Sequence, residues 1–183
     1  MGKKSRDEDG IDIICEGMGF DPNVAYELTK MMLEHHSRSV VAGKMLASIS
    51  RGEDAEKVKR QMRKDFLKIM KQPIEESREI QRRLLWQVSE YEWLIEPRDS
   101  ILEGMKDYGN SGPIYYKIIV DYYLTKERKT IDQLAQELQF SRSSIENKKR
   151  EAIKLFGIMM YRYADQKEHE EKDNPDDDMM AVV

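Results

Sequence analysis

The sequence contains little cysteine, proline or aromatic residue, and each scarcity excludes a class of protein. The single thiol, Cys15, leaves no partner for an internal disulfide and argues against a zinc site. Aromatic residues make up 8% of the chain and charged residues 36%, a balance that favours helices over sheets. No apolar run approaches the ~18 residues that suggest a transmembrane helix, and the N-terminus lacks the apolar core of a signal peptide. We therefore expect an all-α cytoplasmic protein with no membrane segment.

Residue types that carry catalysis or bind metals are not grouped along the chain. His35 and His36 are adjacent, so on a helix their side chains would point about 100° apart and could not share a metal. The Gly17-Met-Gly19 stretch is too short for a phosphate-binding loop, and no strand precedes it. We expect no enzyme, no catalytic residue, no metal site, no cofactor and no small-molecule substrate.

Charge is distributed unevenly. The chain carries a net charge of −4, but the stretch from Asp165 to Asp178 alone holds eight acids against two lysines. The remainder is therefore slightly basic, which keeps binding to nucleic acid open. We predict an acidic tail over residues 165–183 that is disordered beyond Lys172.

The stretch from Thr130 to Phe156 predicts two helices joined by a turn. Thr130 can cap a first helix through its hydroxyl, and Gln139-Phe140 forms the turn. Ser141 is suited to cap the second helix. Apolar residues follow helical spacing on the inward side of both helices. In the first helix they are Ile131, Leu134, Ala135 and Leu138. In the second helix they are Ile145, Ala152, Ile153 and Phe156, and we expect these four to face the first helix.

The outward residues of the second helix suit DNA. Between Arg142 and Lys154 there are five basic residues and two acids, a local charge of +3. Arg can pair with guanine and Asn with adenine in the major groove, so Arg142 and Asn147 are our candidates for base readout. Lys148 and Arg150 would hold phosphates. An ordinary helical hairpin with a solvated charged face is the alternative that this pattern leaves open.

This stretch resembles region four of bacterial sigma factors, in which a Thr-capped helix is followed by a turn and a basic reading helix. From Leu84 to Tyr163 it is most similar to the phage late-gene activators of the ArpU and RinA type. Gln139 stands where a turn glycine is common, and Lys148 stands where primary sigma factors have an apolar residue. The resemblance implies double-stranded DNA and RNA polymerase as partners in transcription regulation. It implies DNA contacts at Arg142, Ser143, Ser144, Asn147 and Lys148, with phosphate contacts at Thr130 and Ser141.

The rest of the chain predicts further helices. Asp21-Pro22 is a helix start, Asp99 or Ser100 should cap a short helix, and Ile114 to Leu124 supplies a supporting helix. Asp54 to Lys71 is amphipathic with a basic outer face that could be solvated, contact DNA or bind the acidic tail. We predict that residues 1–10 are disordered, 11–108 a helical region for oligomerisation or partner binding, 109–113 a dividing loop, 114–164 the helix-turn-helix domain and 165–183 the tail.

Two other functions remain open at this stage. Small terminase subunits of phages also combine a helix-turn-helix with helical oligomerisation elements, so a DNA-packaging protein that forms a homo-oligomer would have a similar sequence. A helical adaptor or inhibitor could use the same surface against a protein.

Overall fold

The computed structural model describes residues 6–41, 53–90, 94 and 97–173. Within these ranges the chain forms helices and turns and no strand, which confirms the all-α prediction. In the same ranges, no helix combines the length and apolar character needed to cross a membrane. The end of the acidic tail, residues 174–183, lies outside the described residues.

The chain begins with two helices, α1 (Arg6–Gly17) and α2 (Pro22–Val41). The predicted start of α2 is confirmed: the Asp21 carboxylate accepts a hydrogen bond of 2.7 Å from the Asn23 amide, as an N-cap does. Disorder was predicted to extend to Gly10, but α1 already begins at Arg6. Ile11 and Cys15 are fully buried, and their burial orders a segment whose first turn is polar.

The middle of the chain contains α3 (Glu53–Met70), the short 3₁₀ helix η1 (Ile74–Ser77), α4 (Arg78–Glu90) and α5 (Arg98–Lys106). The amphipathic helix predicted from Asp54 to Lys71 corresponds to α3. The predicted cap of α5 at Asp99 or Ser100 is wrong, because both residues lie inside the helix and no side chain caps its start at Pro97.

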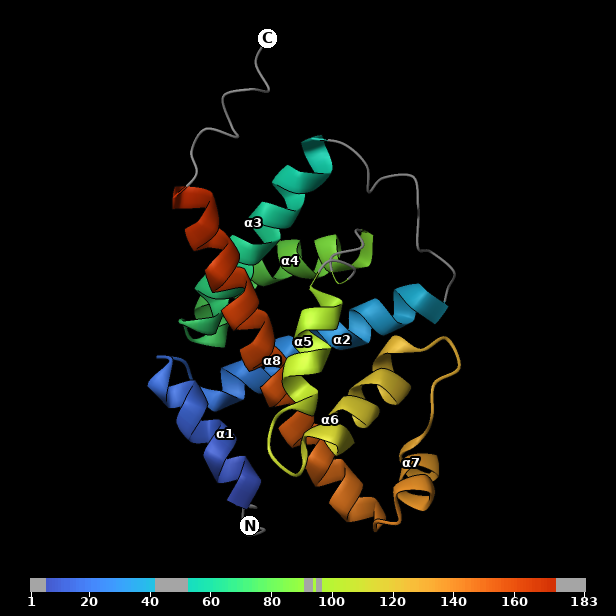
Figure 1. Cartoon of the computed structure of the whole chain (residues 1–183). Coiled ribbons are helices and arrows are strands. Elements are labelled where there is room, and N and C mark those ends of the chain that lie inside the picture. The colour runs from blue at the N-terminus through green and yellow to red at the C-terminus, as the bar shows by residue number, and fades with distance from the viewer. Residues whose placement is uncertain (1–5, 42–52, 91–93, 95–96, 174–183) are drawn as a thin grey trace.

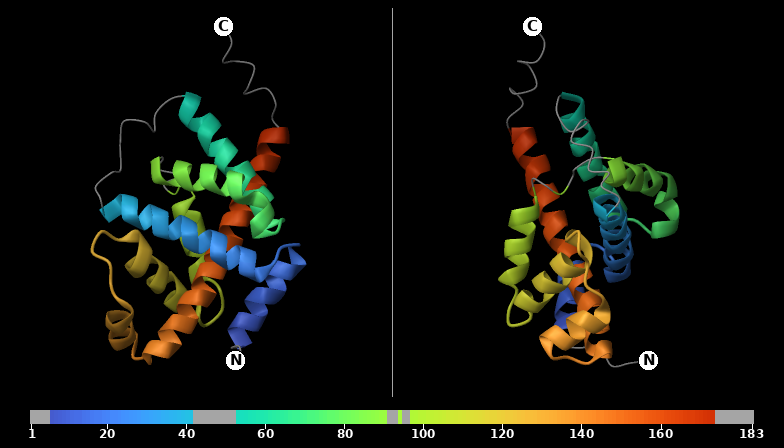
Figure 2. Two further views of the ribbon diagram at one scale, coloured as in Figure 1. Left: turned by 180° about the vertical axis from the view of Figure 1, so that it is seen from behind. Right: turned by 90° about the vertical axis from the view of Figure 1, so that its right-hand side faces the viewer.

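The last part of the chain contains α6 (Gly112–Ile119), the short π-helix η2 (Val120–Leu124), α7 (Ile131–Leu138) and α8 (Arg142–Asp173). Pro113 lies in the first turn of α6, where its missing N–H is tolerated, so the predicted loop at 109–113 ends earlier than expected. With 32 residues, α8 is the longest helix of the described chain and runs diagonally through the molecule (Figure 1). The two views of Figure 2 show helices from both halves of the chain packed around it.

One hydrophobic core joins the two halves of the chain. It includes Ile11 of α1, Leu28 of α2, Phe66 of α3 and Phe156 of α8, all buried. The turn between α5 and α6 therefore does not separate two cores. Ala152, Ile153 and Phe156 were expected to face α7 but belong to this large core, because α8 leaves α7 after its first turns and is then buried nearly all round.

The acidic segment from Asp165 continues α8 to Asp173 and packs against α3. Glu168 accepts a hydrogen bond of 3.4 Å from Arg63, and Glu171 pairs with Arg63 and, at 2.9 Å, with Arg60. Of the three roles considered for the basic face of α3, pairing with the protein's own acidic segment is therefore observed. The tail begins later than residue 165 because these ion pairs and the buried Ala164 extend the helix.

Candidate nucleic-acid interface

The start of α7 is fixed by a capping box. The Thr130 hydroxyl accepts a hydrogen bond of 3.2 Å from the Gln133 amide, and the Gln133 side chain accepts one of 2.8 Å from the Thr130 amide. Each bond satisfies a backbone N–H that a helix start leaves unpaired. The prediction that Thr130 caps this helix is confirmed, and its hydroxyl is already engaged.

The turn after α7 places Gln139 in the left-handed region, with φ 57° and ψ 38°. The Phe140 amide donates to the Ala135 carbonyl at 3.0 Å and the Gln139 amide to the Gln136 carbonyl at 3.4 Å, the bond pattern of a Schellman motif. Glycine is the usual residue at this position, so the turn has the expected geometry with an unusual residue.

The start of α8 is capped by Ser141, as predicted. Its hydroxyl accepts a hydrogen bond of 3.1 Å from the Ser144 amide and lies 2.8 Å from the Ser144 hydroxyl. Behind the turn, Ile118 of α6, Leu134 and Ala135 of α7 and Ile145 of α8 form a small core of their own. This core sets the angle at which α8 leaves α7.

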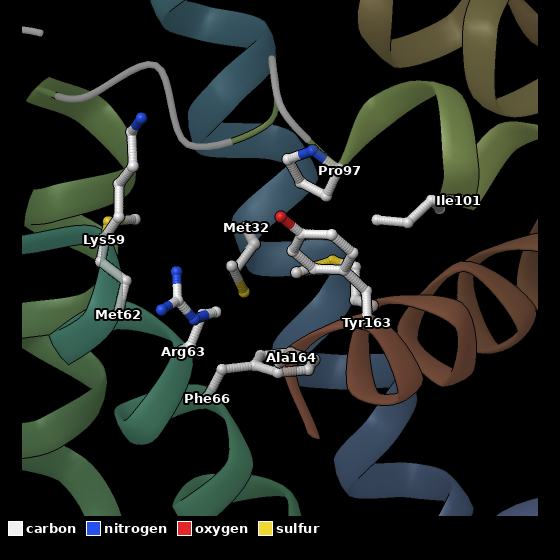
Figure 3. A pocket seen from close by; sticks show the side chains of 10 residues that line it. Met32, Lys59, Met62, Arg63, Phe66, Pro97, Ile101, Tyr163 and Ala164 are labelled. Carbon is white, nitrogen blue, oxygen red and sulfur yellow. The ribbon is translucent and has the colours of Figure 1, made fainter. Parts of the chain in front are cut away.

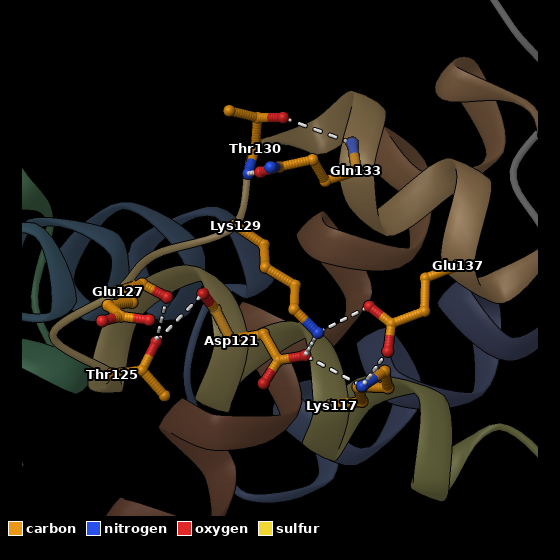
Figure 4. A network of polar contacts seen from close by, with 8 residues as sticks. All are labelled: Lys117, Asp121, Thr125, Glu127, Lys129, Thr130, Gln133 and Glu137. Atoms are coloured by element: carbon orange, nitrogen blue, oxygen red, sulfur yellow. Dashed lines mark hydrogen bonds and ion pairs between the residues drawn. The ribbon is translucent and has the colours of Figure 1, made fainter.

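An ion network fastens α7 to the supporting helix (Figure 4). Lys129, just before α7, contacts Asp121 at 3.0 Å and Glu137 at 2.6 Å, and Lys117 contacts the same two carboxylates at 2.9 and 2.8 Å. Burial raises the pKa of Asp121, but its hydrogen bonds to Lys117 and Lys129 outweigh this and lower the pKa overall. The network holds both ends of α7 against α6 and η2.

The predicted contact residues lie close together, although not all of them are equally accessible. Arg142, Ser143, Asn147 and Arg150 are exposed on α8, as are Thr130 and Ser141 at the two caps. Ser144 and Lys148 are half-buried. Residues 142, 143, 146, 147 and 150 follow helical spacing, so the exposed positions form one continuous face at the start of α8.

Arg142 is already paired in the free protein. Its guanidinium lies 3.0 Å from Asp132 of α7 and 3.2 Å from Glu146 of α8. The hydrogen bond to Glu146, with the charge of Asp132 added, raises the pKa of Arg142 above its ordinary value. All three side chains are at least half exposed, and such surface pairs contribute little stability because water screens them.

The other basic residues of α8 are less free than the sequence suggested. Lys148 lies over the Phe140 and Tyr115 rings at 5.4 and 5.7 Å, and Lys149 lies 4.5 Å from the Tyr122 ring. Lys154 was counted in the outward charge, but it is only 2% exposed and pairs with Asp12 of α1 at 2.7 Å. The local charge of +3 is therefore not all at the surface.

A small cavity lies elsewhere, between α2, α3, α5 and α8 (Figure 3). It measures about 50 Å³ and is lined mainly by apolar side chains, among them Met32, Phe66 and Ile101, with Arg63 at its edge. Sites for cofactors and drug-sized ligands are generally about 300–1,000 Å³. The cavity has room for a few water molecules at most.

Three ion pairs of the predicted contact residues were not predicted from the sequence. Glu146 could have been found, since it stands four residues after Arg142, the spacing of a helical ion pair. Asp132 reaches Arg142 only across the turn, and Glu8 reaches Arg150 only through the packing of α1 on α8. No local pattern in the sequence indicates the contact between Glu8 and Arg150.

The chain matches no protein-family model, no curated protein and no solved structure.

Proposed function

We propose that the chain binds double-stranded DNA through α7, the turn and the first turns of α8, and that it acts by binding alone in transcription regulation. The observation that carries this proposal is the exposed polar face of Arg142, Ser143 and Asn147 beside two capped helix starts. A helix presented in this way can enter the major groove with its N-terminal residues.

Base readout would fall to Arg142 and Asn147. Asn147 is exposed and can form two hydrogen bonds to adenine. Arg142 would exchange Asp132 and Glu146 for guanine or a phosphate, at little cost because water screens exposed ion pairs. Glu146 and Asp132 would then disfavour nearby phosphates and restrict how α8 can dock.

Phosphate contacts would come from the margins of this face. Ser143 is exposed, and Lys148 is half-buried with its ammonium over two aromatic rings. Thr130 and Ser141 accept capping bonds, and a hydroxyl can still donate its proton to a phosphate oxygen. Ser141 would have to turn its proton away from the Ser143 and Ser144 hydroxyls, which lie 3.1 and 2.8 Å from it. The resemblance to sigma region four adds RNA polymerase to the proposed partners.

The first test is a salt series of binding to duplex DNA, with a randomised duplex pool used to select a target. Asn147→Ala should weaken binding to the selected duplex by about 1–3 kcal/mol and relax its sequence preference at one base pair. Asn110→Ala, in the exposed turn before α6, is the matched control and should bind like the unaltered protein. Absence of saturable binding at low salt would contradict the proposal.

A protein-binding adaptor is the second candidate, and one observation favours it. Carboxylates lie among the cations on the surface formed by α7, the turn and the start of α8, here called the α7–α8 surface; they belong to Asp132, Glu137 and Glu146. Phe140, at the turn, is 37% exposed. A mixed-charge surface with an aromatic centre suits a protein partner. This function is favoured if the protein shows no saturable binding to duplex DNA, and if Phe140→Ala abolishes a complex that the unaltered protein forms with purified RNA polymerase.

A further inference from the structure

The acidic helix α1 lies at the same end of the molecule as the start of α8. Both views in Figure 2, like Figure 1, place the N-terminal end of α1 beside the lower part of α8. Between Asp7 and Glu16 the helix carries five carboxylates, at positions 7, 8, 9, 12 and 16. Several of them point toward the helices that support the proposed DNA surface.

Asp12 and Asp7 have structural tasks. Asp12 lies 2.7 Å from the buried Lys154 ammonium and neutralises it. Asp7 accepts a hydrogen bond of 2.6 Å from Ser111 and thereby ties α1 to the start of α6. Loss of Asp12 would remove a charge partner from the buried Lys154 ammonium, and loss of Asp7 would remove the hydrogen bond to the half-buried Ser111, so both carboxylates contribute to the fold.

Glu8 stands in a different position. It contacts Lys154 at 3.0 Å, where Asp12 is already present, and it also reaches Arg150 at 3.8 Å. The Arg150 guanidinium lies 5.0 Å from the Tyr26 ring of α2, which keeps it on the α1–α2 side of α8. The Arg150 side chain is nevertheless 50% exposed, and it belongs to the same face of α8 as Ser143 and Asn147.

Water has access to this contact. A cleft of about 400 Å³ between α1, the start of α2 and α8 is lined by Glu8, Asp12, Arg150 and Lys154, among others. Arg150 can therefore change partner without unpacking the core, whereas the buried Lys154 cannot.

We propose that Glu8 is an acidic brake on DNA binding: it holds Arg150 away from the phosphate backbone and keeps a negative charge beside the third turn of α8. This inference rests on the proposed function and adds regulation to the same site. A DNA phosphate and the Glu8 carboxylate compete for one guanidinium, and the carboxylate also repels the duplex. Any partner that binds Glu8 or displaces the start of α1 would release the brake.

The test is a double-mutant cycle on the full chain, measured as the affinity for duplex DNA over a salt series. Glu8→Gln should bind about three- to tenfold more tightly at low salt, and its plot of log K against log salt should steepen by about one phosphate contact. Glu79→Gln on α4, which changes the net charge equally at an exposed and remote position, should produce less than half of that gain. Far-UV circular dichroism and thermal melting should show that Glu8→Gln folds, since Asp12 still pairs with Lys154.

Arg150→Gln supplies the second arm of the cycle. If Glu8 acts through Arg150, Glu8→Gln should gain clearly less in the Arg150→Gln background than in the unaltered chain, because only the direct repulsion between Glu8 and the duplex is then removed. An equal gain in both backgrounds, or no gain beyond Glu79→Gln, would overturn the brake while leaving DNA binding intact. If neither the unaltered protein nor Glu8→Gln binds DNA at low salt, both the brake and the proposed function fail.

Discussion

Gln139 is the only non-glycine residue with a positive φ among the residues that the structure describes. A side chain in the left-handed region crowds the backbone and costs roughly 1 kcal/mol, while glycine has no such cost. The residue is exposed and makes the turn through its backbone, so its side chain is not needed for the Schellman bonds. The turn is thus formed against a local preference.

We predict that Gln139→Gly stabilises the protein by roughly 0.5–1 kcal/mol in urea denaturation, because the strain is relieved. The control is Gln136→Gly, an exposed position inside α7, which should destabilise by about 1 kcal/mol through the loss of helix propensity. Destabilisation by Gln139→Gly would mean that the glutamine side chain has a role that its backbone contacts do not explain.

The lysines of α8 show how one residue type takes different roles along one helix. Lys148 and Lys149 lie over aromatic rings near the turn, whereas Lys154 is buried against Asp12. The sequence presents all three as members of one basic run. Their roles differ because α8 passes from the exposed α7–α8 surface into the shared core within two turns or so.

At the scale of elements, α8 crosses α2 at close range beside Gly157. A Cβ built at Gly157 would lie 2.3 Å from the Thr29 hydroxyl and 3.4 Å from the Ala25 carbonyl. Real Cβ atoms do not approach another atom to 2.3 Å, so a side chain at position 157 would force Thr29 or one of the two helices to move. This crossing fixes how the N-terminal helices sit on the helix that carries the proposed reading surface.

Gly157→Ala should therefore push α2 and α8 apart and destabilise the protein by about 1–3 kcal/mol in chemical denaturation. Gly104→Ala is the matched control, since its new methyl would meet the flexible Met159 side chain and should change stability by less than about 1 kcal/mol. Thr29→Ala in the Gly157→Ala background should restore part of the loss. Equal effects of the two glycine substitutions would show that the crossing is not tightly packed.

For the whole molecule, the shared core predicts one cooperative unit. Residues of α1 to α6 and of α8 lie in a single cluster, and Arg63 of α3 pairs with Glu168 at the far end of α8. Neither half of the chain can expose its side of this core without loss of the other's packing. The fold therefore differs from two independent domains joined at residues 109–113.

We expect urea unfolding followed by tryptophan fluorescence and by far-UV circular dichroism to give the same midpoint. Trp86 and Trp93 both precede the turn, so fluorescence reports on the first half, whereas dichroism also reports on α6 to α8. Two separate transitions by dichroism, with fluorescence following only one of them, would contradict a single unit and support the division into two domains.

Local sequence signals determined much of this protein. The all-α class, the helix starts after Asp21, Thr130 and Ser141, and the turn at Gln139 follow from capping residues and helical periodicity, which act over a few residues. The DNA contacts inferred from the same stretch remain predictions.

Only the tertiary structure decided which charges are available. Lys154 pairs with Asp12 of α1, and Glu168 near the acidic end of α8 pairs with Arg63 of α3. Glu8 reaches Arg150, and in all three pairs the residues are about 100 or more positions apart. Such contacts depend on how apolar faces pack together, and the local sequence around one residue does not predict its distant partner. Local sequence signals set the positions of the residues proposed to read DNA, whereas the fold set their electrostatic surroundings.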